Sequence, residues 1–179
     1  MKLIIFGPPG SGKGTIATLL KNSLKLQHLS TGEIFREELK RKTRLGKEAH
    51  DKYWKQGKLV PDKIVINIVK NKLKKIKDNF ILDGFPRTKN QAKELDNFSP
   101  IDQVIVLDVP YHVLKTRLLR RAKLEGREDD NEETIKERFK VYRQESEPLL
   151  KHYKNKILLV DADHTPEETY NFIFNELTQ

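Results

Sequence analysis

The feature that most constrains the fold is a series of short apolar runs in which hydrophobic residues follow one another without polar residues between them. A strand with one face in water alternates polar and apolar residues, whereas a strand covered on both faces is continuously apolar. Amphipathic stretches separate the runs, an order typical of α/β proteins. We therefore expect a three-layer sandwich with a parallel sheet between helices. The runs are residues 3–6, 80–82, 104–107 and 157–160, with 27–29 as a weaker candidate.

The amphipathic stretches carry helical periodicity and helix-end signals. In residues 64–76 the apolar residues fall on one helical face and the lysines on the opposite face, and Asp62 suits the first turn. A helix is expected over 132–152, kinked or ended by Pro148. Thr165 marks the cap of a last helix. No repeat, low-complexity tract or linker divides the chain, so we expect a single domain spanning residues 1–179.

A glycine-rich string joins the first apolar run to an amphipathic stretch. It satisfies the G-x-x-x-x-G-K pattern of a phosphate-binding loop, but Gly14 replaces the usual Ser/Thr and Thr15 follows one position later. Glycines let backbone N–H groups converge on phosphate oxygens, and Lys13 adds a full positive charge. The alternative is a glycine-rich turn with a surface lysine, but the strand–turn–helix context favours phosphate binding. The expected phosphate ligands are Gly10, Ser11, Gly12, Lys13, Gly14 and Thr15.

Charge and cysteine content narrow the classes of partner. The chain carries 35 Lys and Arg against 26 Asp and Glu, a net charge of +9, which implies an anionic partner: nucleic acid, an acidic membrane surface or phosphorylated small molecules. The absence of cysteine excludes disulfides, a Cys-ligated zinc site and a thiol nucleophile. No apolar segment is long enough to span a membrane. The apolar N-terminus reads as a strand rather than a leader, so we expect a cytoplasmic protein.

Three further strings give the direction of the function. They are Leu29-Ser30-Thr31-Gly32-Glu33-Ile34-Phe35-Arg36, Leu82-Asp83-Gly84-Phe85-Pro86-Arg87-Thr88 and Gly126-Arg127-Glu128-Asp129-Asp130-Asn131. With the glycine loop, they resemble the nucleoside monophosphate kinases, and among them the adenylate kinases, from residue 1 to about 163. The resemblance implies a five-stranded parallel sheet with two mobile inserts. The monophosphate-binding insert would be residues 30–60 and a short lid 119–131, with a core of 1–29, 61–118 and 132–179.

The resemblance also implies roles for charged and polar side chains. Phosphoryl transfer requires two nucleotides held in line and compensation of charge on the moving group, for which arginine is well suited. Donor-side contacts to ATP are expected from the glycine loop, Arg117 and Arg121. Acceptor-side contacts to AMP are expected from Thr31, Arg36, Lys58, Leu59, Val60, Gly84, Phe85, Arg87, Gln91, Arg127 and Arg138. The groups expected to act in catalysis are Lys13, Arg87, Arg117, Arg127 and Arg138.

The metal expected is Mg²⁺ alone. Asp83 follows a buried strand, where a carboxylate can hold Mg²⁺ through water, and Thr15 offers a hydroxyl. The short lid has neither the length nor the cysteines of zinc-binding relatives. Asp129 and Asp130 resemble lid acids that pair with arginines on closure.

The acceptor is expected to be AMP, with UMP/CMP kinase as the alternative. Thr31, Gln91 and the 57–60 stretch match the adenylate branch, and the Gln91 amide offers a donor and an acceptor to adenine N6 and N1. A nucleic-acid-binding protein is a remote alternative, since lysines opposite an apolar stripe are explained by a solvated helix face. A nucleotide switch or structural ATPase leaves the second phosphate site unexplained. The resemblance implies a monomer that binds neither nucleic acid nor membrane.

Overall fold

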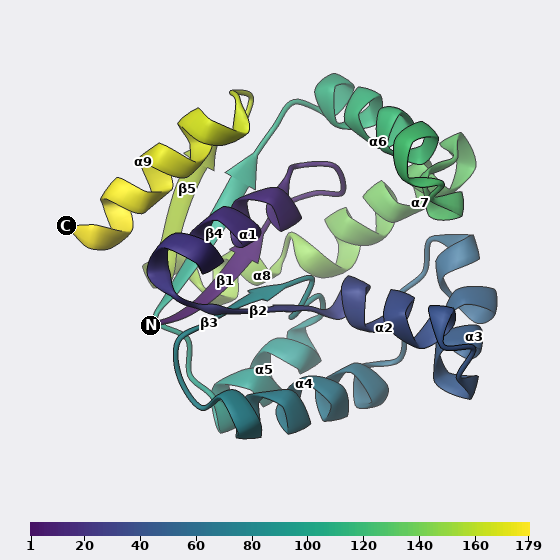
Figure 1. The fold of residues 1–179 in the computed structure, drawn as a ribbon, viewed down its shortest axis with the longest axis horizontal. Coiled ribbons are helices and arrows are strands. Elements are labelled where there is room, and N and C mark those ends of the chain that lie inside the picture. The colour runs from purple at the N-terminus through teal and green to yellow at the C-terminus, as the bar shows by residue number, and fades with distance from the viewer.

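Five parallel strands form one sheet in the computed structural model, which describes residues 1–179 (Figure 1). The order across the sheet is β2-β3-β1-β4-β5, and every neighbouring pair is parallel. Each apolar run, including the weaker candidate, lies within one strand, so the predicted α/β class is confirmed. The strands are β1 (Lys2–Phe6), β2 (Gln27–Ser30), β3 (Phe80–Asp83), β4 (Gln103–Asp108) and β5 (Ile157–Asp161).

Helices cover both faces of this sheet. In Figure 1, α1 and α9 lie over one face and α4 and α5 over the other, while α2, α3, α6 and α7 extend to the side away from the chain termini. The first helices are α1 (Lys13–Leu24), α2 (Thr31–Lys40), α3 (Arg44–Lys52), α4 (Asp62–Ile76) and α5 (Lys89–Phe98). They are followed by α6 (Tyr111–Glu125), α7 (Glu132–Val141), α8 (Leu149–His152) and α9 (Pro166–Thr178). Short 3₁₀ turns occupy Trp54–Gln56, Glu128–Asp130 and Lys154–Lys156.

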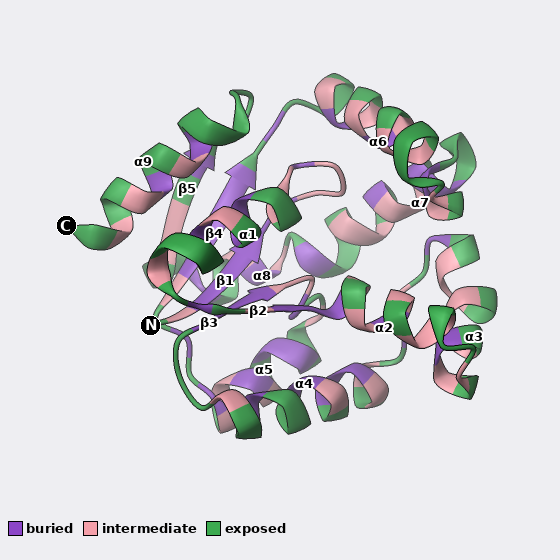
Figure 2. Ribbon diagram, viewed as in Figure 1, coloured by how far each residue is buried: buried purple, intermediate pink, exposed green.

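The hydrophobic core is divided by the sheet into two layers. Successive strand residues point to opposite faces, so Leu3 and Ile5 pack in one layer and Ile4 and Phe6 in the other. Figure 2 shows the buried residues concentrated on the central strands. The prediction that the strands are buried on both faces is confirmed for β1, β3 and β4. It is wrong for the edge strand β5, where Leu159 is 63% exposed. An edge strand has a neighbour on one side only, and no helix covers Leu159.

The helix expected over 132–152 is interrupted earlier than Pro148. Helix α7 ends at Val141, a π-helical turn follows at Tyr142–Ser146, and α8 begins after Pro148. Within the turn, the buried Ser146 donates a hydrogen bond from Oγ to the carbonyl of Arg87. The wider turn therefore anchors this stretch to the segment after β3.

The segments that the resemblance assigns to inserts contact each other. Residues 30–60 comprise α2, α3 and a 3₁₀ turn, and residues 119–131 comprise the end of α6 and the next turn. His50 Nε2 lies 3.5 Å from Glu128 Oε2, and Thr134 Oγ1 donates to the carbonyl of Lys55 at 3.4 Å. The first contact joins the two segments, and the second joins residues 30–60 to α7, which follows the shorter segment. None of the helices combines the length and apolar character that a membrane crossing requires.

Candidate active site

The glycine loop lies between β1 and α1, at the carboxyl end of the central strand. Gly10 has φ of +85°, and a Cβ there would lie 2.9 Å from the carbonyl oxygen of Leu114 in α6. Gly12 has φ of +91° at the N-cap of α1. Both positions favour glycine, because L side chains rarely adopt such a backbone and Gly10 also has no room for one. The loop therefore directs the positive end of the α1 dipole into the site.

Lys13 is the first residue of α1 and folds back over the loop. Its Nζ donates to the carbonyls of Gly7 at 2.9 Å and Pro8 at 2.8 Å, and to Oγ of Ser11 at 3.3 Å. Burial lowers the pKa of Lys13 to about 7; Asp83 opposes this shift, while nearby arginines reinforce it. The ammonium is thus held among neutral acceptors beside an excess of positive charge, where an added anion would stabilise it.

Two adjoining cavities receive nearly all the site residues predicted from the sequence. The larger is a cleft of about 780 Å³ and the smaller has about 80 Å³. The larger cleft is lined by Gly10, Ser11, Gly12, Lys13, Gly14, Thr15, Asp83, Phe85, Arg117, Arg121 and Arg127. The smaller is lined by Thr31, Lys58, Val60, Gln91 and Asp129. Both are lined by Arg36, Leu59, Gly84, Arg87 and Arg138. Three arginines therefore stand where the cavities meet.

Arg36 and Arg87 carry positive charge without a carboxylate partner. Neither makes an ion pair, and Arg87 uses its Nε–H to bond the carbonyl of Gly84 at 2.9 Å. Burial and the neighbouring Arg127 lower the pKa of Arg36, and burial and Arg138 lower that of Arg87. The lack of an ion pair at either residue, together with the neighbouring arginines, leaves local positive charge that favours binding of an anion.

Arg121 and Arg138, in contrast, are paired with the acids predicted to anchor the lid. Arg121 makes a bidentate pair with Asp130, with Nε–Oδ2 at 2.6 Å and Nη2–Oδ1 at 2.8 Å. Arg138 bonds Asp130 Oδ1 and Asp129 Oδ2 through Nη1. The Asp130 side chain is fully buried and is the one predicted site residue that lines neither cavity. It acts on the cleft through the two arginines.

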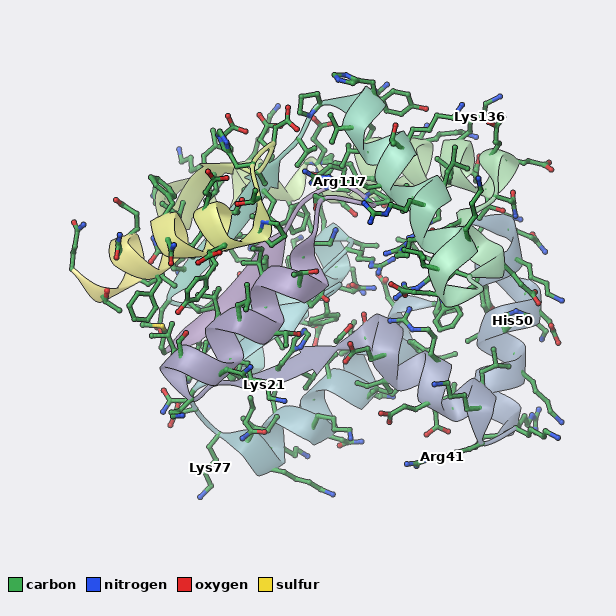
Figure 3. All side chains as sticks on the ribbon, turned by 45° about the horizontal axis from the view of Figure 1, so that its top comes forward. Lys21, Arg41, His50, Lys77, Arg117 and Lys136 are labelled. Carbon is green, nitrogen blue, oxygen red and sulfur yellow. The ribbon has the colours of Figure 1, made fainter.

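The remaining two arginines are held by weaker contacts. Arg127 pairs with Glu125 at 2.7 Å, near the surface. Arg117 donates from both Nη atoms to the carbonyl of Ala162 at 3.2 Å, which links α6 to the segment after β5. Figure 3 shows Arg117 directed inward, whereas Lys77, Arg41 and Lys136 extend from the periphery. The basic side chains thus divide into an internal set and a solvated set.

Asp83, at the end of β3, is the only carboxylate among the sequence-derived residues of the larger cleft. Its Oδ2 lies 3.6 Å from Nε2 of the buried His28. Burial alone would raise the pKa of Asp83, but the contact with His28 and the charge of Lys13 outweigh it and leave the pKa below its ordinary value. Thr15 lines the same cleft. A carboxylate and a hydroxyl are hard oxygen ligands that fit Mg²⁺, whose other positions are commonly filled by water and phosphate. No group of three or more His, Cys, Asp or Glu residues forms a dedicated metal cage.

The smaller cavity is built around Gly84, where the chain leaves β3. Gly84 has φ of +75°, and a Cβ would lie 2.9 Å from both Arg87 Nη2 and Thr31 Oγ1. The Thr31 hydroxyl donates to the Gly84 carbonyl at 2.9 Å. The amide of Gln91 is also engaged: Oε1 accepts from the Arg87 N–H at 2.7 Å and Nε2 donates to Asp62 at 2.7 Å. Sequence reasoning placed these residues together but did not foresee their protein partners.

Sequence reasoning missed several residues that shape the site. Arg120, Leu124 and Tyr142 line the larger cleft, and Trp54 lines the smaller one. Trp54 packs edge-to-face on Phe35 in α2, with ring centroids 5.7 Å apart. No local pattern marks Leu124, Tyr142 or Trp54, because each reaches the site through the packing of separate segments. The spacing of Arg120 on the same helix as Arg117 and Arg121 was the only available signal.

These features define a class of protein. A glycine loop at the N-terminus of α1, a carboxylate at the end of β3 and two cavities joined by arginines are the components of a P-loop protein that binds two phosphorylated ligands. The fold confirms the five-stranded parallel sheet expected from the resemblance.

Comparison with known proteins identifies the family. The model of the adenylate kinase family matches residues 5–158. Adenylate kinase of Clostridium tetani is 38% identical over 212 residues, covering 99% of this chain and 97% of the relative. Adenylate kinase of Prochlorococcus marinus (strain MIT 9515) is 45% identical over 168 residues, covering 90% of each. That of Thermus thermophilus is 42% identical over 175 residues, covering 94% and 92%. The chain therefore belongs to the adenylate kinase family of nucleoside monophosphate kinases.

Proposed function

We propose that the protein is an ATP:AMP phosphotransferase, which transfers a phosphoryl group reversibly from Mg-ATP to AMP and forms two ADP. The observation that carries the proposal is the pair of adjoining cavities with Arg36, Arg87 and Arg138 at their junction. The bond between the γ-phosphorus of ATP and its bridging oxygen breaks, and a bond to an oxygen of the AMP phosphate forms. The transferred phosphoryl group moves past these arginines, whose positive charges compensate its negative charge.

The larger cleft is the donor site in this proposal. The loop amides from Gly10 to Thr15 and the ammonium of Lys13 bind the ATP phosphates, for which Lys13 exchanges its bonds to loop carbonyls. Arg117 lies at the far end, beside the segment after β5. Mg²⁺ would be held by Asp83, through water, and by Thr15, and it would supply neutralisation of phosphate charge. Asp129 and Asp130 position Arg138 and Arg121 at the cleft.

The smaller cavity is the acceptor site. Arg36 and Arg87 bind the phosphate of AMP, and the base lies against Thr31, Gln91 and the backbone of residues 58–60. Selection of AMP over UMP or CMP rests on the Gln91 amide. Closure of segments 30–60 and 119–131 over the two nucleotides would exclude water and limit hydrolysis of ATP. We also propose that the protein acts as a cytoplasmic monomer.

The experiment is an acceptor screen. The purified protein is incubated with ATP, Mg²⁺ and each of AMP, UMP, CMP and GMP, and the nucleotides are separated by chromatography. We expect ADP to form in a two-to-one ratio to AMP consumed, with much slower use of the other acceptors, and no turnover with excess EDTA. A preference for UMP or CMP would assign the chain to the pyrimidine branch. ATP hydrolysis that is independent of any acceptor would contradict the proposal.

A second measurement addresses the remaining parts of the proposal. Light scattering during gel filtration is expected to give the mass of one 21.0 kDa chain. Retardation of RNA or DNA at physiological ionic strength would instead favour the nucleic-acid alternative, because such binding depends on a basic surface.

A further inference from the structure

A carboxylate outside the predicted site organises the segment that follows β3. Asp62 begins α4, and its carboxylate accepts hydrogen bonds from Thr88 Oγ1 at 2.8 Å, Asn90 Nδ2 at 3.1 Å and Gln91 Nε2 at 2.7 Å. The three donors lie 26 to 29 residues away along the chain. Asp62 therefore joins the start of α4 to the start of α5 at the wall of the smaller cavity.

These contacts fix which way the Gln91 amide points. A carboxylate can only accept and a backbone N–H can only donate. The Nε2 atom must face Asp62 Oδ1, and the Oε1 atom must face the N–H of Arg87. A flip of the amide would break both bonds and place like groups against each other. Since Gln91 is only 2% exposed, water cannot readily replace the lost partners.

The fixed orientation leaves one defined donor and one defined acceptor. A glutamine amide has two N–H donors and two oxygen lone pairs, and the protein uses one of each. Because Gln91 lines the smaller cavity, the second N–H and the second lone pair are the positions available to a ligand there. Adenine offers an acceptor at N1 and a donor at N6. Hypoxanthine and guanine offer the reverse, a donor at N1 and an acceptor at O6.

We propose that Asp62 is a positioning residue that sets the selectivity of the acceptor site for 6-amino purines over 6-oxo purines. The inference rests on the proposed function, since it assumes that the acceptor base binds beside Gln91. Asp62 does not line either cavity and acts through the amide of Gln91. Without its carboxylate, the amide is free to rotate and to match the edge of either base.

The test compares AMP with IMP as acceptors in Asp62→Ala. We expect the KM for AMP to rise about tenfold, the ratio of kcat/KM for AMP to that for IMP to fall about tenfold, and the KM for ATP to stay within twofold. Asp62→Asn keeps an oxygen toward Gln91 and should restore most of the selectivity. Asn90→Ala is the matched control, because it removes another bond to the same carboxylate without touching Gln91, and its selectivity should equal that of the wild type.

The possible outcomes separate the two proposals. A wild-type protein that does not use AMP would contradict the proposed function before any variant is compared. An active Asp62→Ala with wild-type selectivity, or an equal loss in Asn90→Ala, would overturn the role of Asp62.

A measurement on the native chain covers the case in which Asp62→Ala does not fold. In ¹⁵N-labelled protein, one side-chain N–H of Gln91 should exchange slowly with solvent, because it is bonded to Asp62. The other should exchange faster and shift on addition of AMP. Two protons that exchange alike and shift alike would overturn the proposal.

Discussion

Two pairs of arginines in this protein face the same cleft with opposite electrostatic surroundings. Arg36 and Arg87 have no carboxylate within ion-pair distance, and the pKa of each lies below its ordinary value. Arg121 and Arg138 share Asp130, and Asp129 adds a further contact to Arg138. Burial alone would lower the pKa of Arg121, but its bonds to Asp130 raise it. One pair lacks counter-charge and the other already has it.

The two pairs of arginines differ in what they must give up when a phosphate binds. An unpaired guanidinium gives up no existing ion pair when an anion binds, so we expect Arg36 and Arg87 to act as a preorganised anion site. A paired guanidinium is held in position by its acid and shares its remaining donors with an incoming phosphate. Arg87 should therefore matter for turnover rather than stability, whereas the acids beside Arg121 and Arg138 should matter for stability.

The largest expected effect is that of Arg87→Ala on turnover. Removing one charged donor to a transferred group typically lowers kcat by about 10²–10³-fold. Stability should not fall by more than about 1 kcal/mol, because Arg87 is exposed in the cleft and makes no ion pair that the variant would break. Steady-state kinetics and chemical denaturation measure the two effects.

Arg87→Lys is the matched control for this prediction. Lysine keeps the charge but lacks the planar fork, so its kcat should lie between those of the wild type and Arg87→Ala. Near-wild-type turnover in Arg87→Ala would remove Arg87 from the catalytic set. A large loss of stability in Arg87→Ala would mean that Arg87 supports the fold, which would contradict the prediction that it matters mainly for turnover.

Asp130 is the acid shared by Arg121 and Arg138, and its loss should lower the stability of the fold. Asp130→Asn keeps the size of the side chain but leaves two arginines near a buried neutral group. Loss of one partner from a buried ion pair costs about 3–5 kcal/mol, and with a second acid, Asp129, still present we expect about 3 kcal/mol. For a chain of this size that corresponds to a fall in Tm of roughly 6–12 °C. A thermal melt showing a change below about 2 °C would contradict the structural role of Asp130.

Sequence reasoning was most successful where function depends on local chain geometry. The glycine loop, the carboxylate at Asp83 and the arginine positions follow from strings that fold as strand–turn–helix units, so their placement at one edge of a parallel sheet was foreseeable. The pairing of Arg121 and Arg138 with Asp130 is also short in sequence, spanning nine and eight residues.

The contacts that sequence reasoning missed connect distant segments. The bonds from Gln91 to Asp62 span 29 residues, and the bond from Ser146 to the Arg87 carbonyl spans 59. Such pairs leave no periodicity or motif, since each partner looks like an ordinary polar residue in its own helix. The π turn at Tyr142–Ser146 was missed for a local reason: no proline or glycine marks it, and Pro148 lies two residues later.

A smaller effect is expected in the pH dependence of ATP binding, which reports the protonation of Lys13. Burial lowers the pKa of Lys13, and the positive charge of Arg87 lowers it further. The pKa of Lys13 is about 7 in the free protein, and bound phosphates would raise it. Binding then takes up a proton above pH 7, so ATP affinity should fall by up to about tenfold per pH unit from 7 upward. Calorimetry in buffers of different ionisation enthalpy counts the proton.

Lys13→Met is the control for this titration. It should lose most turnover and show no such proton uptake. The free energy of unfolding should depend on pH in the opposite direction to ATP binding. Between pH 7 and 10.5, Lys13 holds fewer protons in the folded protein than in the unfolded chain. Its contribution to stability therefore rises with pH over that window. An unfolding free energy of the wild type that falls relative to Lys13→Met over the same window would contradict the lowered pKa.

The exposed ion pair between Arg127 and Glu125 should contribute least of all. Glu125→Gln removes the acid beside Arg127, whose side chain is 22% exposed while that of Glu125 is 50% exposed. An ion pair this close to solvent contributes about 0.5 kcal/mol or less, so Tm should change by at most about 2 °C. If Arg127 contacts the phosphate of AMP, releasing it from Glu125 leaves kcat unchanged and lowers the KM for AMP by at most twofold. A loss of stability in Glu125→Gln as large as that in Asp130→Asn would group Arg127 with Arg121 and Arg138. Burial of the acid would then not explain which arginine pairs stabilise the fold.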